Sequence, residues 1–430
     1  MSDKRNVYLD HAATTPVDPR VRAAMLPYLE DEKNFGNPSA IYRLGRESKN
    51  AISEARAKIA AVLGCRPEEI IFTGSGTESD NLAVLGVARS YQEKGNHLIT
   101  SAIEHHAVLR PMEHLAKEEG FEVSYLAVDQ YGRVAVKTLE RALTEKTVLV
   151  SIMFANNEIG TILPIRELAK TIRDWKKARG RGPDEPPFFH TDACQAAGYL
   201  DLNVARLGID LLTINGSKIY GPKGTGVLFK RRGVRLKPLI YGGGQESGLR
   251  SGTENVAGII GLTTALEIAS GEREKETVRL IPLRDKLIAG ILERIPKVVL
   301  NGHPTERLPN NVNVSILDVE GEAVLLYLDE QGIAAATGSA CDSASLDPSH
   351  VILAIGRPYE FAHASIRFSL GRSTTGEDID YVLAKLPGVV ELLRQVSPVK
   401  IELDGAVTGS KTAFVEMGRP HWERSMAKGK

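Results

Sequence analysis

The chain has 430 residues, of which 42% are hydrophobic and 25% are charged, an ordinary composition for a soluble globular protein of two or three domains. Lys plus Arg and Asp plus Glu both number 54, and this zero net charge argues against a nucleic-acid or anionic-membrane partner. No signal peptide or membrane-spanning apolar run is recognised. Cys65, Cys194 and Cys341 are too few and too far apart for a disulfide framework, so we expect a reducing, cytoplasmic location.

Apolar runs of strand length alternate with helical periodicity through the first half of the chain. Ile52, Ala55 and Ile59 recur at helical spacing, and Gly64 stands where a helix C-cap belongs. A helix is also expected over 78–90, and strands are expected at 69–73, 97–100, 123–128, 147–153, 188–191 and 210–214. Strands separated by helices at this spacing predict βαβ units, and hence an α/β protein with a mostly parallel sheet.

The later part of the chain has a different order of elements. A domain boundary is expected within a long helical region at about 257–295. Beyond it, short strands mix with helices, with strands at 311–317 and 365–370 and helices at 322–327 and 377–394. This order predicts a smaller α+β domain, followed by a polar and weakly periodic tail.

Ligands of open parallel sheets bind beyond the carboxyl ends of the strands, so the loops after these strands are the candidate sites. The first such loop holds Gly76 and Thr77 at the start of a helix. Its backbone N–H groups could bind a phosphate, although a tight turn with a capping hydroxyl explains the same residues. A dinucleotide fingerprint requires Gly or Ala where Ser79 stands, so a dehydrogenase interpretation ranks last.

Another loop follows the apolar strand at 210–214 and contains Lys218. It resembles a P-loop only superficially, because Pro222 displaces the lysine that would bind nucleotide phosphates. A lysine at the end of a buried strand can lose its solvation, which makes its amine nucleophilic. Most loop lysines are simply solvated, and the local sequence does not rank Lys218 above Lys223.

Asp192 follows the strand at 188–191 and could bind a protonated ring nitrogen. His190 and Cys194 are close to it in sequence and raise the question of a metal. No second Cys or His pair stands at zinc-finger spacing, so no metal is expected, and Cys194 is interpreted as a small core residue.

Two more segments hold a base or a nucleophile. His105 and His106 are expected in an extended stretch, where their side chains would point in opposite directions and at most one would face a site. Cys341 stands in a small, polar run of serine and alanine. Its thiol is intrinsically nucleophilic, but the loop alone favours an ordinary serine- and alanine-rich segment with an incidental cysteine.

Taken together, these segments resemble the cysteine desulfurases, which are pyridoxal-phosphate enzymes of aminotransferase-like fold. The resemblance extends from Tyr8 to about Pro398, and its most specific motifs are at 8–16, 156–160, 218–224, 242–246, 250–253 and 338–341. The cysteine run, with its continuation to His350, is similar to the nitrogen-fixation and housekeeping iron–sulfur branch.

The resemblance implies a division of the chain. A large domain at 16–260 would bind the cofactor on a mostly parallel, seven-stranded sheet flanked by helices. Residues 1–15 and 261–398 would form the small α+β domain, which would carry a mobile cysteine loop at about 336–350. The tail at 399–430 differs from the usual short ending of the family, so a scaffold-protein contact there is in doubt.

The resemblance also implies residue roles. Lys218 would bind pyridoxal 5'-phosphate covalently and move the substrate α-proton, and Cys341 would receive the substrate sulfur as a persulfide. Asp192 would contact the pyridine nitrogen, Gln195 the ring oxygen and His105 the ring face, where it would also help in proton transfer.

Further roles concern the phosphate and the substrate. The phosphate would be held by residues of the two loops that follow strands 69–73 and 210–214, namely Gly76, Thr77, Asn215 and Ser217. Thr253 of a second subunit would also contact it. Asn157 and Arg367 would hold the substrate carboxylate, a task that suits the planar fork of arginine, and Asn157 would also contact the cofactor. Ser217 occupies a position where histidine is common, so the grip on the phosphate is expected to be weaker or differently shared.

The expected activity is conversion of L-cysteine to L-alanine, with the sulfur passed to an iron–sulfur scaffold protein or to another acceptor for thio-cofactors. A homodimer is implied through Thr253. One alternative keeps the cofactor and changes the substrate, as in a selenocysteine lyase or another lyase or aminotransferase. An alternative of another class is a binding platform for a scaffold protein, with little activity of its own.

Overall fold

The computed structural model describes residues 5–30, 34–338 and 348–397. A seven-stranded sheet forms the larger unit, in the order β2-β8-β7-β6-β5-β3-β4. Its strands are β2 (Ile70–Thr73), β3 (His97–Ser101), β4 (Glu122–Leu126), β5 (Thr147–Ser151), β6 (Phe188–Asp192), β7 (Leu211–Asn215) and β8 (Gly226–Lys230). Neighbouring strands pair in parallel except around β8, which is antiparallel to both β2 and β7.

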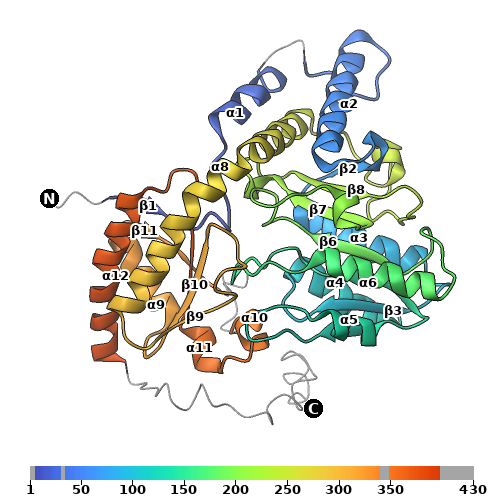
Figure 1. Ribbon diagram of the computed structural model, residues 1–430. Helices are drawn as coiled ribbons and strands as arrows, with labels where there is room; N and C mark the ends of the chain where they lie inside the picture. The colour runs from blue at the N-terminus through green and yellow to red at the C-terminus, as the bar shows by residue number, and fades with distance from the viewer. Residues whose placement is uncertain (1–4, 31–33, 339–347, 398–430) are drawn as a thin grey trace.

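The strands of this sheet are apolar along their whole length because both faces are covered. Ile71 packs in the core cluster beneath two helices, whereas Ile70 and Phe72 point to the opposite face and join the largest cluster. The covering helices are α2 (Arg43–Leu63), α3 (Gly76–Ser90), α4 (His106–Glu118), α5 (Val136–Ala142), α6 (Ile165–Ala178) and α7 (Val204–Leu207) (Figure 1). The mostly parallel α/β fold expected from the sequence is therefore confirmed.

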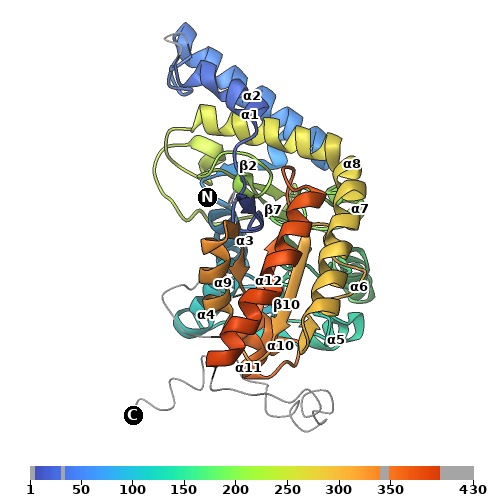
Figure 2. The ribbon, with the colours of Figure 1, turned by 90° about the vertical axis from the view of Figure 1, so that its left-hand side faces the viewer.

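The second unit contains an antiparallel sheet in the order β12-β13-β10-β9. Its strands are β9 (Val298–Leu300), β10 (Asn311–Ile316), β12 (Ala336–Thr337) and β13 (Ser365–Ser369). Its helices are α9 (Gly321–Glu330), α10 (His350–Ala354), α11 (Tyr359–His363) and α12 (Gly376–Val396). A separate hydrophobic cluster fills the space between α12, the later half of α8 and β10 (Figure 2).

Helix α8 (Val256–Arg294) runs from one unit to the other, and the N-terminal segment also crosses between them (Figure 1). Strand β1 (Val7–Tyr8) pairs in parallel with β11 (Ile333–Ala334), and α1 (Pro19–Met25) then packs on α8. Single 3-10 turns complete the described elements, at Leu26–Tyr28, Pro67–Glu69, Gly216–Lys218 and Gln245–Gly248. None of the helices in the described ranges is both long and apolar enough to cross a membrane.

Local signals predicted some boundaries well and missed others. Gly64 ends α2 with a left-handed φ of 68°, as the sequence predicts. Strand β8 was not expected, because the glycine-rich segment before it masks the short apolar run. The extended stretch expected for His105 and His106 is wrong for His106, which begins α4 because His105 caps that helix.

Candidate active site

The polar residues singled out in the sequence meet at one edge of the large sheet. Asp192 ends β6 and Asn215 ends β7, and the first turn of α3 follows β2. His105 follows β3 after a short loop. Strands β2, β3, β6 and β7 all run in the same direction, so their carboxyl ends bring these residues together.

The N-terminus of α3 offers a cradle for an anion. The first N–H groups of a helix, here those of Gly76 and Thr77, have no acceptor within the helix, and the helix dipole adds positive potential. A Cβ on Gly76 would lie 2.8 Å from Cys194 Sγ and 3.1 Å from Asn215 Cβ, so only glycine lets this turn approach the neighbouring strand ends. Thr77 is exposed beside it.

The turn after β7 presents Lys218. Asn215 Oδ1 accepts hydrogen bonds from both the N–H and the hydroxyl of Ser217, each at 3.1 Å. These bonds close the 3-10 turn Gly216–Lys218. Lys218 Nζ then reaches the carbonyl oxygen of Ala13 at 2.5 Å, whereas Lys223 is exposed. The structure thus places Lys218 at the site and Lys223 outside it.

Asp192 is buried at the end of β6, where its Oδ1 accepts a hydrogen bond of 2.8 Å from the N–H of Cys194. Two more buried carboxyl groups lie near it. Burial raises the pKa of Asp80 well above its ordinary value, and it raises the pKa of Glu104 to about 8. Burial thus favours the neutral form of both neighbours, which weakens their competition with Asp192 for a cationic partner.

His105 caps α4 through its ring. Its Nδ1 accepts a hydrogen bond of 3.0 Å from the N–H of Ala107, which assigns the proton of the neutral imidazole to Nε2. Burial lowers the pKa of His105, against the opposing effect of the Asp192 charge. The ring is therefore neutral and presents an N–H at Nε2.

Asn157 and Arg367 come from different units and meet at the site. Arg367 Nη1 donates to the carbonyl oxygen of Asn157 at 3.0 Å, and Nη2 binds Asp10 Oδ1 at 2.8 Å. Asn157 Oδ1 and Arg367 Nε are buried without a hydrogen-bond partner in the described part of the chain. Because buried polar atoms in native proteins are normally paired, these two atoms indicate a place for a ligand.

Two other predicted site residues are also placed. Gln195 Nε2 donates to the carbonyl oxygen of Ala12 at 2.9 Å, which holds the N-terminal segment beside the loop after β6. Thr253 is exposed in the loop before α8. In the same loop, Arg250 Nε donates to Glu78 Oε1 at 2.9 Å, so the loop is attached to the first turn of α3.

Cys341 lies in segment 339–347, outside the described residues, but both flanks of that segment are placed. Ser349 Oγ donates to Glu158 Oε2 at 2.5 Å. A Cβ on Gly338 would lie 2.7 Å from the same oxygen. The two flanks therefore meet at Glu158, the residue that follows Asn157.

Comparison with known proteins identifies the family. Residues 7–382 match the family model described as Aminotransferase class-V. A protein named Cysteine desulfurase IscS from Dictyoglomus turgidum is 52% identical over 399 residues, which are 93% of this chain and 98% of the relative. Another of that name, from Methanosarcina thermophila, is 51% identical over 398 residues, which are 93% and 95% of the two chains. The chain belongs to the cysteine desulfurases of the class-V aminotransferase family.

Solved structures agree with this assignment. A NifS-like protein superposes with a TM-score of 0.83 at 36% identity and covers 90% of this chain and 100% of its own. A structure described as SspA in complex with cysteine has a TM-score of 0.72 at 35% identity and covers 85% and 98% of the two chains.

The residues of this cysteine desulfurase fit pyridoxal phosphate. The glycine-lined cradle at α3 suits a phosphate, and the buried Asp192 suits a protonated ring nitrogen. The amine of Lys218 lies on the adjacent turn, beside the end of β7. These three groups are the phosphate, ring-nitrogen and aldehyde partners that the cofactor requires.

Several functional contacts of the site were missed from the sequence. Asp10 and Glu158 stand in two of the family motifs and Glu104 directly precedes His105, but the sequence assigned no role to them. The sequence feature that could have identified them is an acidic residue near the end of a strand, surrounded by apolar residues or glycine. Such a residue is costly to bury without a partner, which indicates a specific contact.

Proposed function

We propose that this protein is a pyridoxal-phosphate-dependent L-cysteine desulfurase that forms L-alanine and a persulfide on Cys341. The observation that carries the proposal is that Lys218 and Asp192 follow or end neighbouring strands of the large sheet, while Asn157 Oδ1 and Arg367 Nε are buried with no hydrogen-bond partner among the described residues. This arrangement occurs in a chain that is half identical to proteins named cysteine desulfurase.

Each end of the cofactor would be held by a different strand end. Gly76 and Thr77 would bind the phosphate with Asn215 and Ser217, while Asp192 would hold the pyridine nitrogen. Gln195 would contact the ring oxygen, and the His105 ring would cover one face. When bound, pyridoxal phosphate supplies an electron sink that is conjugated to the substrate α-carbon.

The protein groups would then orient the substrate and move its protons. Arg367 Nε would donate to the substrate carboxylate, and Asn157 Oδ1 would accept a hydrogen bond from an N–H or O–H group of the bound ligand, since both atoms lack a partner in the described residues. The Lys218 amine would take the α-proton, as a lysine can once it is near-neutral and desolvated. The Nε2–H of His105 would donate a hydrogen bond or a proton at the ring face.

Sulfur transfer is balanced without an external oxidant. The Cys341 thiolate attacks the substrate sulfur, so an S–S bond forms and the substrate Cβ–S bond breaks. The electron pair stays with carbon, which takes up a proton to give the methyl group of alanine. The sulfur is oxidised to the persulfide level while that carbon is reduced.

The second subunit and the sulfur acceptor complete the proposal. Thr253 of one protomer would reach the phosphate of its partner in a homodimer. Exposed apolar side chains around α1 and α2 support an interface there, including Leu29, Phe35 and Ile41, which are 65%, 70% and 89% exposed. The acceptor would be an iron–sulfur scaffold protein or another thiol in the cytoplasm. The free thiols of Cys65 and Cys194 fit such a reducing compartment.

The test measures both products of one reaction. Purified protein is incubated with L-cysteine and a reductant, and alanine and sulfide are quantified together, beside the Cys341→Ala variant. We expect equal amounts of both products, lost in the variant while the cofactor absorbance is kept. Full activity of Cys341→Ala would refute the persulfide step, and faster turnover of selenocysteine than of cysteine would favour the selenocysteine lyase.

A further inference from the structure

The N-terminal segment from Asp10 to Asp18 crosses the site and contacts groups from both units. Asp10 binds Arg367 Nη2 at 2.8 Å, at the substrate end. The carbonyl oxygens of the next residues accept bonds from site side chains, Ala12 from Gln195 at 2.9 Å and Ala13 from Lys218 at 2.5 Å.

Thr15 contacts the turn on both sides of Lys218. Its Oγ1 donates to the carbonyl oxygen of Ser217 at 2.9 Å and accepts a bond of 2.8 Å from the N–H of Tyr220. Its own N–H also donates to Ser217 O at 2.9 Å. One side chain, only 2% exposed, therefore ties the residue before Lys218 to the second residue after it.

Tyr220 holds a costly backbone conformation that needs this support. Its φ of 64° lies in the left-handed region, which is unfavourable for a bulky residue. Its carbonyl oxygen accepts a bond from Asp18 N at 3.0 Å, and its hydroxyl accepts one from Arg372 N at 2.7 Å.

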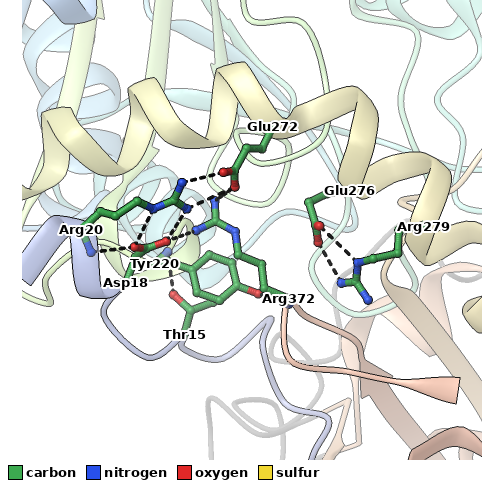
Figure 3. A network of polar contacts seen from close by, with 8 residues as sticks. All are labelled: Thr15, Asp18, Arg20, Tyr220, Glu272, Glu276, Arg279 and Arg372. Carbon is green, nitrogen blue, oxygen red and sulfur yellow. Dashed lines mark hydrogen bonds and ion pairs between the residues drawn. The ribbon is translucent and has the colours of Figure 1, made fainter. Parts of the chain in front are cut away.

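The same network reaches the small domain (Figure 3). The Arg372 guanidinium lies 4.3 Å from the centre of the Tyr220 ring. Its Nη1 binds Asp18 Oδ2 at 2.6 Å, and its Nη2 lies 3.4 Å from Glu272 of α8. Arg372 stands five residues after Arg367, so one segment of the small domain contacts both the substrate end and the lysine turn.

We propose that Thr15 is a positioning residue for Lys218, acting through the hydroxyl that bridges Ser217 and Tyr220. The proposal rests on the proposed function, since it assumes that the Lys218 amine reacts with pyridoxal phosphate. A small displacement of a reacting group lowers the reaction rate strongly. The two hydrogen bonds of the Thr15 hydroxyl fix both sides of the turn, and the turn then directs the Lys218 amine toward the cofactor. Without the hydroxyl, the buried N–H of Tyr220 has lost its acceptor and the strained turn relaxes.

The experiment compares three holoenzymes with the wild type. Thr15→Val removes the hydroxyl at nearly constant volume, whereas Thr15→Ser keeps it. Thr171→Val is the matched control, because it also removes a threonine hydroxyl, one that donates within α6 to the carbonyl oxygen of Glu167 at 3.0 Å. The measurements are the dissociation constant of pyridoxal phosphate and the midpoint pH of the absorbance change of the lysine-bound cofactor.

We expect Thr15→Val to weaken cofactor binding by about tenfold or more, as for a lost buried hydrogen bond, and to shift the midpoint pH. Thr15→Ser keeps the hydroxyl and Thr171→Val alters a helix outside the lysine turn, so the cofactor affinity of both should stay within about twofold of the wild type. If Thr15→Val does not fold, Thr15→Ala gives the same comparison without added bulk.

Two results would overturn the proposal. One is an unchanged affinity and midpoint in Thr15→Val or Thr15→Ala, even with a lowered unfolding temperature, which would mean a purely structural role. The other is a Thr15→Ser variant that behaves like Thr15→Val. Both measurements need only bound cofactor, so failure of the wild type to form alanine would refute the proposed function and leave this test intact.

Discussion

Ser349 Oγ donates a hydrogen bond of 2.5 Å to Glu158 Oε2, and this contact joins the segment after Cys341 to the residue that follows Asn157. Glu158 is 4% exposed, and its backbone carbonyl also accepts a bond from Asn311 at 3.0 Å. One buried glutamate thus contacts Ser349 through its carboxyl group and Asn311 through its backbone, directly beside Asn157.

Glu158 predicts a specific dependence of stability on pH. Burial raises its pKa from 4.5 to about 7, although the Ser349 bond and Arg367 oppose this shift. The unfolded chain ionises first as the pH rises, so the contribution of the protonated group to stability is full below 4.5 and is lost between 4.5 and 7. The loss is on the order of 3 kcal/mol, from about 1.4 kcal/mol per pH unit.

Glu158→Gln keeps a side-chain acceptor for Ser349 but cannot ionise. We expect the free energy of unfolding of the variant, measured by urea denaturation, to fall less than that of the wild type as the pH rises from 4.5 to 7. Parallel curves for the two proteins would contradict a raised pKa at this position.

His105 combines a structural and a chemical role that two substitutions separate. His105→Ala removes the acceptor for the N–H of Ala107 and should cost about 1 kcal/mol of stability, as for other lost N-caps. His105→Asn restores a good capping group and should recover that stability. Both variants lose the ring, so both should form alanine more slowly; recovery of the rate in His105→Asn would mean that only the cap is needed.

Arg367→Lys tests the substrate end of the site. A lysine cannot reach Asn157 O and Asp10 Oδ1 at once, and it has no group that corresponds to Nε, which has no partner among the described residues. We expect the KM for L-cysteine to rise by about tenfold or more, the loss of one charge-assisted hydrogen bond. An unchanged KM with a lowered kcat would instead assign Arg367 to support of the N-terminal segment.

Gly76→Ala tests the phosphate cradle. The added methyl group would lie 2.8 Å from Cys194 Sγ, so the first turn of α3 must move and the affinity for pyridoxal phosphate should fall. Adding Cys194→Ala should restore part of the affinity, because it removes the nearer of the two close contacts. Gly271→Ala is the control, since nothing lies within 4 Å of a methyl group there. An equal loss in the single and double variants would show that the sulfur contact is not the cause.

The sheet and its strand ends could be predicted from the sequence because their signals are local. Apolar runs such as Thr147–Ser151 are buried on both sides, and burial of apolar surface drives their assembly wherever they lie in the chain. The predicted order of strands and helices then places Asp192 and Asn215 at one edge. The long helix expected at 257–295 is α8 within one residue at each end.

The choice between lysines could not be made in this way. Lys218 and Lys223 stand in the same glycine-rich stretch, and the motif that separates them was known only from family resemblance. In the folded chain, the Lys218 amine meets Ala13, which is 205 residues away, whereas Lys223 is exposed. The partnerships of Glu158 with Ser349 and of Thr15 with Tyr220 are similarly distant, at 191 and 205 residues.

The sequence by itself therefore determined the α/β class, the strand ends that could carry chemistry and, through its motifs, the cysteine desulfurase family. Only the tertiary structure decided which side chains meet, which carboxyl groups have raised pKa values and how the N-terminal segment joins the two units. The physical reason is that strand and helix signals come from neighbours in the chain. Contacts and pKa values depend on burial and on charged groups that distant segments of the chain bring together when it folds.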